Sequence, residues 1–206
     1  MSTSPRGYHH GDLRAALLEA AVAALEAGEP FSMRAVARRA GVSPAAPYRH
    51  FADREALESA IAVAGFADLR SELVAAGAEA EGRAETEGAP SAADVITALG
   101  VAYVRFALRR PAVFRLMFGN ACDDTDSERV RASGELYAVL DGVVVRLLPG
   151  ADGPALSTAL WSLAHGLAFL HLDGKFRPEP ERDVVDRIRS SVAAVFELRS
   201  LTGDPA

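Results

Sequence analysis

Residues 31–51, FSMRAVARRAGVSPAAPYRHF, decide the fold of this chain. Ser32 is a good N-cap, and the apolar residues after it recur at helical spacing, so the first part predicts a short helix. Gly41 would end that helix, because glycine adopts the left-handed conformation at little cost. Ser43 and Pro44 suit the N-cap and the first residue of a second helix, expected to reach the end of the stretch. Two short helices joined by a tight turn form a helix-turn-helix.

This stretch is basic although the chain is acidic. Between Ser32 and Arg54 there are five arginines and one acidic residue, Asp53, which gives a local net charge of +4. The whole chain has a formal net charge of −6, so the remaining residues sum to −10. A basic patch on an acidic protein indicates a polyanionic partner such as double-stranded DNA. One alternative is that these arginines are the solvated face of an ordinary helical hairpin. Another is a helical protein-interaction module without sequence-specific DNA binding.

The composition predicts an all-α protein. The chain has 206 residues, 50% of them hydrophobic, which is enough for one or two packed domains. Besides the helix-turn-helix, helical spacing predicts helices over 12–27, 53–73, 91–110, 111–119, 128–148, 154–172 and 181–201. The small, acidic and Gly-rich segment 77–90 predicts a frayed helix end followed by a loop.

The same composition bounds the location and the chemistry. The single cysteine, Cys122, excludes an internal disulfide and a cysteine-based zinc site. No uninterrupted apolar run reaches the roughly 18 residues that a transmembrane helix needs. The first residues, MSTSPRGYHHGD, lack the apolar core of a signal sequence. We therefore expect a cytoplasmic protein with no membrane partner.

Several segments together resemble one family of regulators. GVSPAAPYRHFADREAL and YHHGDLRAALLEAA are similar to the recognition helix and the N-terminal entry of TetR/AcrR-type transcriptional regulators. The resemblance is strong over residues 8–66 and weaker through RFALRRPAVFRLMFG at 105–119 and WSLAHGLAFL at 161–170. The last segment resembles a Trp-x-x-x-His-Gly pattern found in one group of these regulators.

This resemblance implies a domain plan. A three-helix helix-turn-helix DNA-binding domain would occupy residues 1–58. A helical domain that binds an effector and forms the dimer would occupy 59–206. The expected function is ligand-responsive transcriptional regulation, in which a homodimeric repressor binds a pseudo-palindromic operator and is released by a small-molecule effector of unknown identity.

The resemblance also carries over a set of DNA-binding residues. Arg34 could read a guanine through its bidentate fork, and Arg54 matches a position that grips the DNA backbone. Pro44, Ala45 and Ala46 offer few polar atoms to base edges, so we expect recognition to depend partly on thymine methyls and DNA shape. The full expected set is Ser32, Arg34, Ser43, Ala45, Tyr48, Arg49, His50 and Arg54.

Two further sets are expected in the second domain. The first is an apolar effector pocket, with Tyr137 and His165 as orienting polar groups; for any single residue, ordinary helical core is the alternative and the favoured one. Its members are Phe66, Val104, Phe114, Met117, Phe118, Tyr137, Trp161, His165 and Phe169. The second is a four-helix dimer interface, because the helix over 154–172 is apolar on two faces. Its members are Leu156, Leu160, Leu163, Leu167, Ile188, Val192 and Val195.

No motif predicts catalysis. The sequence has no Gly-x-Ser-x-Gly elbow, no Gly-rich phosphate loop and no His-Glu-x-x-His pattern. Ser162 and His165 lie three residues apart on one predicted helix, but no third group is placed to orient the histidine. We therefore expect a protein that is not an enzyme and needs neither a cofactor nor a metal.

Overall fold

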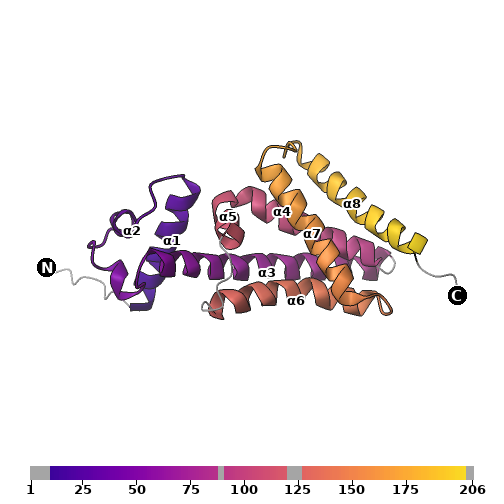
Figure 1. Ribbon diagram of the computed structural model, residues 1–206, viewed down its shortest axis with the longest axis horizontal. Coiled ribbons are helices and arrows are strands. Elements are labelled where there is room, and N and C mark those ends of the chain that lie inside the picture. The colour runs from indigo at the N-terminus through magenta and orange to yellow at the C-terminus, as the bar shows by residue number, and fades with distance from the viewer. Residues whose placement is uncertain (1–9, 88–90, 120–126, 203–206) are drawn as a thin grey trace. The chain divides into compact units, whose positions relative to one another are not determined.

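The computed structural model describes residues 10–87, 91–119 and 127–202 (Figure 1). Within these ranges the chain is helical and contains no strand, so the predicted all-α class is confirmed. The α-helices are α1 (His10–Glu26), α2 (Met33–Arg39), α3 (Arg54–Glu87), α4 (Ala92–Arg109), α5 (Pro111–Gly119), α6 (Ser127–Leu147), α7 (Gly153–Leu172) and α8 (Glu181–Thr202). A single 3₁₀ turn, η1 (Pro47–Arg49), lies between α2 and α3.

The chain divides into two compact units. The first consists of residues 1–65 and 112–129, and the second of residues 66–111 and 130–206. The sequence predicts a division between residues 58 and 59 and places 112–129 in the second domain. In the structure α3 contributes to both units, and most of α5 belongs to the first.

The core of the first unit joins α1, α2, α5 and the start of α3. Leu17, Val36 and Leu57 are fully buried in it. The side chain of Glu26, at the end of α1, accepts hydrogen bonds from the backbone N–H groups of Ala112 (3.1 Å) and Val113 (3.0 Å). These amides open α5 and have no partner within the helix, so the carboxylate satisfies them and ties α5 to α1.

The second unit is built around α4, which packs against α7 and α8. A capping box starts α4: the Ser91 hydroxyl accepts from the Asp94 N–H (3.2 Å), and the Asp94 carboxylate accepts from the Ser91 N–H (3.2 Å). Asp94 thus takes the role that glutamate usually has in this motif. Pro111 follows the helix and prevents its continuation.

One sequence prediction about helix length needs correction. α3 continues without a break to Glu87, where the sequence predicts fraying and a loop from residue 77. Three glycines along α3 weaken helix propensity, but packing of its apolar face outweighs that loss. Among the described helices, α7 passes a test of length and composition for a membrane span, which buried core helices also pass, so the expected absence of a transmembrane helix stays a prediction. Only 28% of its apolar window is buried in the single chain.

Candidate nucleic-acid interface and ligand cavity

The first half of the helix-turn-helix forms as the sequence predicts. The Ser32 hydroxyl accepts a hydrogen bond from the Ala35 N–H at 3.2 Å and caps α2. Gly41 has φ +70°, the left-handed conformation that favours glycine. The N–H of Val42 then donates to the Ala37 carbonyl at 3.0 Å, which closes the helix end and starts the turn.

The second half differs from the prediction of a helix that reaches Phe51. The structure has one 3₁₀ turn, in which the His50 N–H donates to the Pro47 carbonyl at 2.9 Å. Pro47 has no N–H. An α-helix that begins at Ser43 would therefore lack the hydrogen bond from residue 47 to the Ser43 carbonyl. The Ser43 carbonyl instead accepts from the Ala46 N–H at 3.0 Å, in a tight turn. Pro47 and Phe51 are buried and anchor this segment, which leaves Tyr48 and Arg49 exposed.

The predicted DNA-binding residues lie on the surface of the first unit. Seven of the eight are exposed and His50 is half-buried. Tyr48 has an exposed fraction of 54%, which is high for an aromatic side chain and leaves its ring and hydroxyl open to a partner. The exposed seven are Ser32, Arg34, Ser43, Ala45, Tyr48, Arg49 and Arg54. This placement suits a surface that binds a polyanion, and contact of these residues with DNA stays a prediction.

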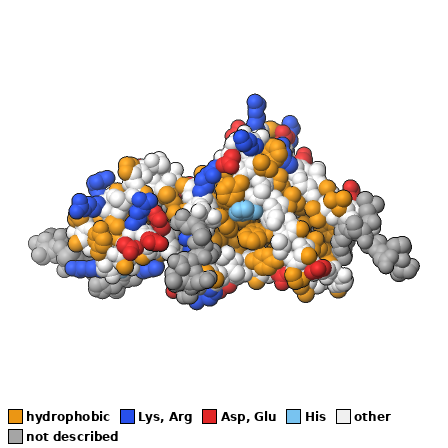
Figure 2. Space-filling model, viewed as in Figure 1, with side chains coloured by type: hydrophobic (Ala, Val, Ile, Leu, Met, Phe, Trp, Pro, Cys, Tyr) orange, Lys and Arg blue, Asp and Glu red, His pale blue; other side chains and the backbone are white. Residues whose placement is uncertain are grey.

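The arginines of this surface fall into two groups. Arg39 forms an ion pair with Glu29 (2.8 Å), and Arg54 pairs with Glu58 (2.7 Å) while stacking over the Phe31 ring at 5.4 Å. Arg34, Arg38 and Arg49 form no ion pair with any residue that the structure describes. Figure 2 shows several Lys and Arg side chains over the region of α1 and α2. Arg34, Arg38 and Arg49, here called the open arginines, therefore present uncompensated positive charge.

Arg38 is absent from the set that the sequence predicts. It lies four residues after Arg34 on α2 and is exposed, so both side chains lie on the same side of the helix. The i, i+4 spacing of Arg34 and Arg38 is the sequence signal that could have identified Arg38 as part of the basic surface. The family resemblance does not include this position.

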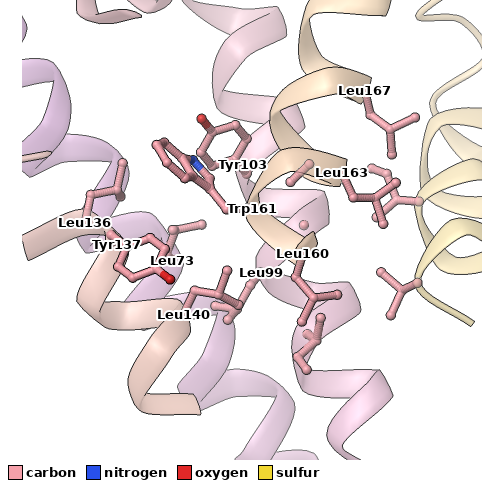
Figure 3. Close-up of a pocket in the computed structure, with 15 residues that line it drawn as sticks. Leu73, Leu99, Tyr103, Leu136, Tyr137, Leu140, Leu160, Trp161, Leu163 and Leu167 are labelled. Atoms are coloured by element: carbon pink, nitrogen blue, oxygen red, sulfur yellow. The ribbon is translucent and has the colours of Figure 1, made fainter. Parts of the chain in front are cut away.

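The second unit contains an apolar cavity of about 40 Å³. Figure 3 shows its walls, with Tyr103 and Trp161 side by side and Tyr137 near Leu73 and Leu140. Helices α3, α4, α6, α7 and α8 all contribute to it. The lining residues are Leu73, Ile96, Leu99, Gly100, Tyr103, Leu136, Tyr137, Leu140, Leu160, Trp161, Leu163, Ala164, Leu167, Ile188 and Val192.

The structure brings only part of the predicted pocket set to this cavity. Tyr137 and Trp161 line it. His165 lies behind the wall, where its Nδ1 is 2.9 Å from the Tyr103 hydroxyl, and the Phe169 ring lies 4.8 Å from the imidazole. The remaining five do not line it: Phe66 and Val104 are buried in the second unit, and Phe114, Met117 and Phe118 belong to the first.

Most of the residues predicted for the dimer contact lie along the cavity. Leu160, Leu163, Leu167, Ile188 and Val192 line it, whereas Leu156 and Val195 are half-buried elsewhere on α7 and α8. Apart from the half-buried Leu163, the lining members of this set have exposed fractions of 6% or less, so they offer little surface to a second copy. The sequence does not distinguish the two uses of these side chains, because a cavity wall and a subunit contact both need apolar residues at helical spacing.

Burial favours the neutral form of the polar groups beside the cavity. It raises the pKa of the Tyr103 hydroxyl, and a hydrogen bond from Trp161 opposes that effect only partly. Burial also lowers the pKa of His165 below its ordinary value of 6.5. Both shifts have the same cause, because a charged side chain loses more hydration on burial than a neutral one. The cavity is therefore bordered by uncharged groups at neutral pH.

The lowered histidine pKa values predict acid sensitivity of the fold. Burial lowers the pKa of His165 and of His171, and the Arg187 charge lowers that of His171 further. Below pH 6.5 the unfolded chain then binds more protons than the folded chain, so stability rises with pH in this range. We expect the thermal unfolding midpoint to be level above pH 6.5 and to fall as the pH drops through the folded pKa values. In His165→Phe the fall should be shallower, and an unchanged profile would show that His165 is not buried as described.

Comparisons with known proteins match both parts of the chain. Residues 17–61 match the family described as bacterial regulatory proteins, tetR family. Residues 96–195 match the family described as tetracyclin repressor-like, C-terminal domain. No curated protein matches the sequence.

Solved structures show the same fold. A protein with unknown function from Rhodococcus sp. RHA1 is 33% identical, with a TM-score of 0.76 over 91% of this chain and 97% of its own. A bacterial regulatory protein in the tetR family from Rhodococcus RHA1 is 18% identical, with a TM-score of 0.63 over 87% of this chain and 94% of its own. The TetR family transcriptional regulator PfmR from Thermus thermophilus is 18% identical, with a TM-score of 0.59 over 86% and 94%.

Proposed function

Because this chain belongs to the TetR family of DNA-binding transcriptional regulators, we propose that it is a ligand-responsive repressor. In this proposal a homodimer binds a pseudo-palindromic operator, and a small-molecule effector in the second unit releases it. The protein would work in the cytoplasm as a regulator and not as an enzyme. The closer resemblance of Trp161 and His165 to the Trp-x-x-x-His-Gly group stays a prediction.

One observation carries the DNA-binding part of the proposal. The open arginines are exposed on the helix-turn-helix and have no ion-pair partner among the described residues, in a chain of net charge −6. Unpaired arginines favour a partner that supplies phosphate oxygens, and guanidinium groups bind these in a bidentate manner. On the same surface, Arg39 and Arg54 are each paired with a glutamate. The alternative, an interaction module without specific DNA binding, would need a different anionic partner for these arginines.

Two features support the effector part. The second unit holds an apolar cavity in the middle of its helices. Leu73, on α3, lines the cavity, and the same unbroken helix begins at Arg54 in the first unit. We propose that an effector shifts the population between two positions of α3, by no more than its difference in affinity for the two states.

The uncovered side of α7 supports a dimer. Ala155, Ala159 and Ser162 are exposed along α7, and Leu170 continues this line with an exposed fraction of 39%. A helix this apolar is stable in water when a second surface covers it. We propose that the same side of α7 in a second copy provides that cover, since most soluble oligomers are symmetric homo-oligomers.

We expect the wild-type chain to sediment as a dimer at micromolar concentration. Ser162→Arg should shift it toward monomer, because the interface would bury a charge without a partner. Ala138→Arg, at an exposed position of α6, is the matched control and should leave the dimer intact. Sedimentation velocity distinguishes these outcomes, and a monomeric wild-type chain would contradict the dimer.

A reporter assay tests repression itself. The DNA upstream of the protein's own gene would drive a reporter in cells with and without the protein. Repression predicts a lower signal when the protein is present. A higher signal would show an activator, and equal signals would remove this DNA as its target.

A further inference from the structure

The walls of the cavity are almost entirely hydrocarbon. No Asp, Glu, Lys, Arg or His is among the described side chains that line it. Only Tyr103, Tyr137 and Trp161 bring a polar side-chain atom to this described wall. The remaining lining side chains are aliphatic or absent, so the ligand contacts would be apolar over nearly the whole surface.

The few polar atoms already have partners in the protein. The Tyr103 hydroxyl is 2.9 Å from Nδ1 of His165 and takes a hydrogen bond from Trp161. The Tyr137 hydroxyl lies 3.4 Å from the Thr158 hydroxyl. A ligand with an ionised head group would have to break these bonds or leave its charge unpaired.

From this wall we infer that the cavity binds an uncharged, hydrocarbon-rich molecule and rejects carboxylates and quaternary ammonium ions of the same size. The inference rests on the proposed function for its biological meaning, because it names the chemical class of the effector. Burying a carboxylate here would cost its hydration without any cation in return. A quaternary ammonium ion would meet three aromatic rings, but no carboxylate lies in the described wall to balance its charge.

The cavity is also small for a ligand site. It holds about 40 Å³, compared with roughly 300 Å³ or more for typical ligand pockets. A ligand of several carbon atoms must therefore displace wall side chains or move α7 relative to α4 and α6. Leu163 is half-buried and lines the cavity, so shortening it should enlarge the site without opening the deepest part of the core.

Trp161 reports binding directly, because it is the only tryptophan in the chain and lines the cavity. The experiment titrates the full chain with 1-octanol, octanoate and octyltrimethylammonium, and follows tryptophan fluorescence below the concentrations at which the probes aggregate. The three probes share a chain length and differ in charge. We expect saturable binding of octanol, at least about tenfold tighter than either ion.

Variants locate the binding in the cavity. Ala164→Phe fills it and should abolish the octanol response, whereas Ala138→Phe makes the same change at an exposed position of α6 and should preserve it. Leu163→Ala enlarges the cavity and should bind octanol more tightly, which covers the case in which Ala164→Phe does not fold. Circular dichroism checks the helical content of each variant.

Tighter binding of either ion, or no binding of octanol to the wild type and Leu163→Ala, would overturn the inference. An octanol response that survives in a folded Ala164→Phe would overturn it as well. Measuring DNA binding of the same samples distinguishes failure of the proposed function from failure of the inferred ligand class. If the chain binds duplex DNA but prefers an ion, the proposed function stands and the inferred ligand class is wrong. If the chain binds octanol but no DNA, the inferred ligand class stands and the proposed role as a transcriptional regulator is wrong.

Discussion

Arg34→Ala and Arg49→Ala are each expected to weaken operator binding by roughly 1–3 kcal/mol per half-site. Both side chains are exposed and lack an ion-pair partner among the described residues, so little protein structure depends on them. Fluorescence anisotropy with a labelled operator duplex measures the loss. If either arginine contacts phosphate instead of a base, the affinity should fall equally for all sequences and the salt dependence should become shallower.

The matched control for these variants is Arg131→Ala. It removes one positive charge from an exposed position on α6, where Arg131 is only loosely paired with Glu135 at 3.7 Å. Its operator affinity should stay close to that of the wild type. Equal losses in all three variants would mean that net charge alone drives binding, and that the open arginines have no special role.

Gly65→Leu is expected to destabilise the chain by about 1–3 kcal/mol or more, because the position is tightly packed. A Cβ at Gly65 would lie 2.7 Å from Sδ of Met117 and 2.9 Å from Cγ1 of Val113. Met117 can rotate away, but Val113 is stiff and fully buried, so a branched side chain has nowhere to go. Urea unfolding followed by circular dichroism measures the change in the free energy of unfolding.

Gly82→Leu is the control on the same helix. A Cβ at Gly82 meets nothing within 4 Å, and the position is exposed. Replacing glycine by leucine there should stabilise α3 by roughly 0.5–1 kcal/mol through helix propensity alone. If both variants were stabilised to the same extent, α5 would not pack against α3 as the structure describes.

Local patterns in the sequence predict most of the fold. Caps and left-handed glycines are predicted from neighbouring residues, which is why Ser32 and Gly41 take their predicted roles. The second half of the helix-turn-helix is predicted less well. The sequence predicts a helix to the end of the stretch, whereas the structure forms a 3₁₀ turn, because Pro47 has no N–H for an α-helical bond.

The cavity depends on contacts that no local pattern contains. Leu160 and Ile188 follow the spacing of a subunit contact, yet they line a cavity that five helices form together. Tyr103 is absent from the predicted pocket because its importance comes from its hydrogen bond to His165, 62 residues away in the sequence. The DNA-surface residues are easier to find, since the family resemblance assigns them to matching positions of one short segment, and seven of the eight are exposed. Their contact with DNA stays a prediction.

One measurement tests the central claim most directly: anisotropy titration of the full chain against duplexes tiled across the DNA upstream of its own gene, at several salt concentrations. The proposed function predicts tight binding to one duplex, with two protomers bound and an affinity that falls steeply as salt rises. Equal weak binding to every duplex would support the DNA-binding surface and show that the operator lies outside this region. No binding even at low salt would contradict the regulator and favour the interaction module.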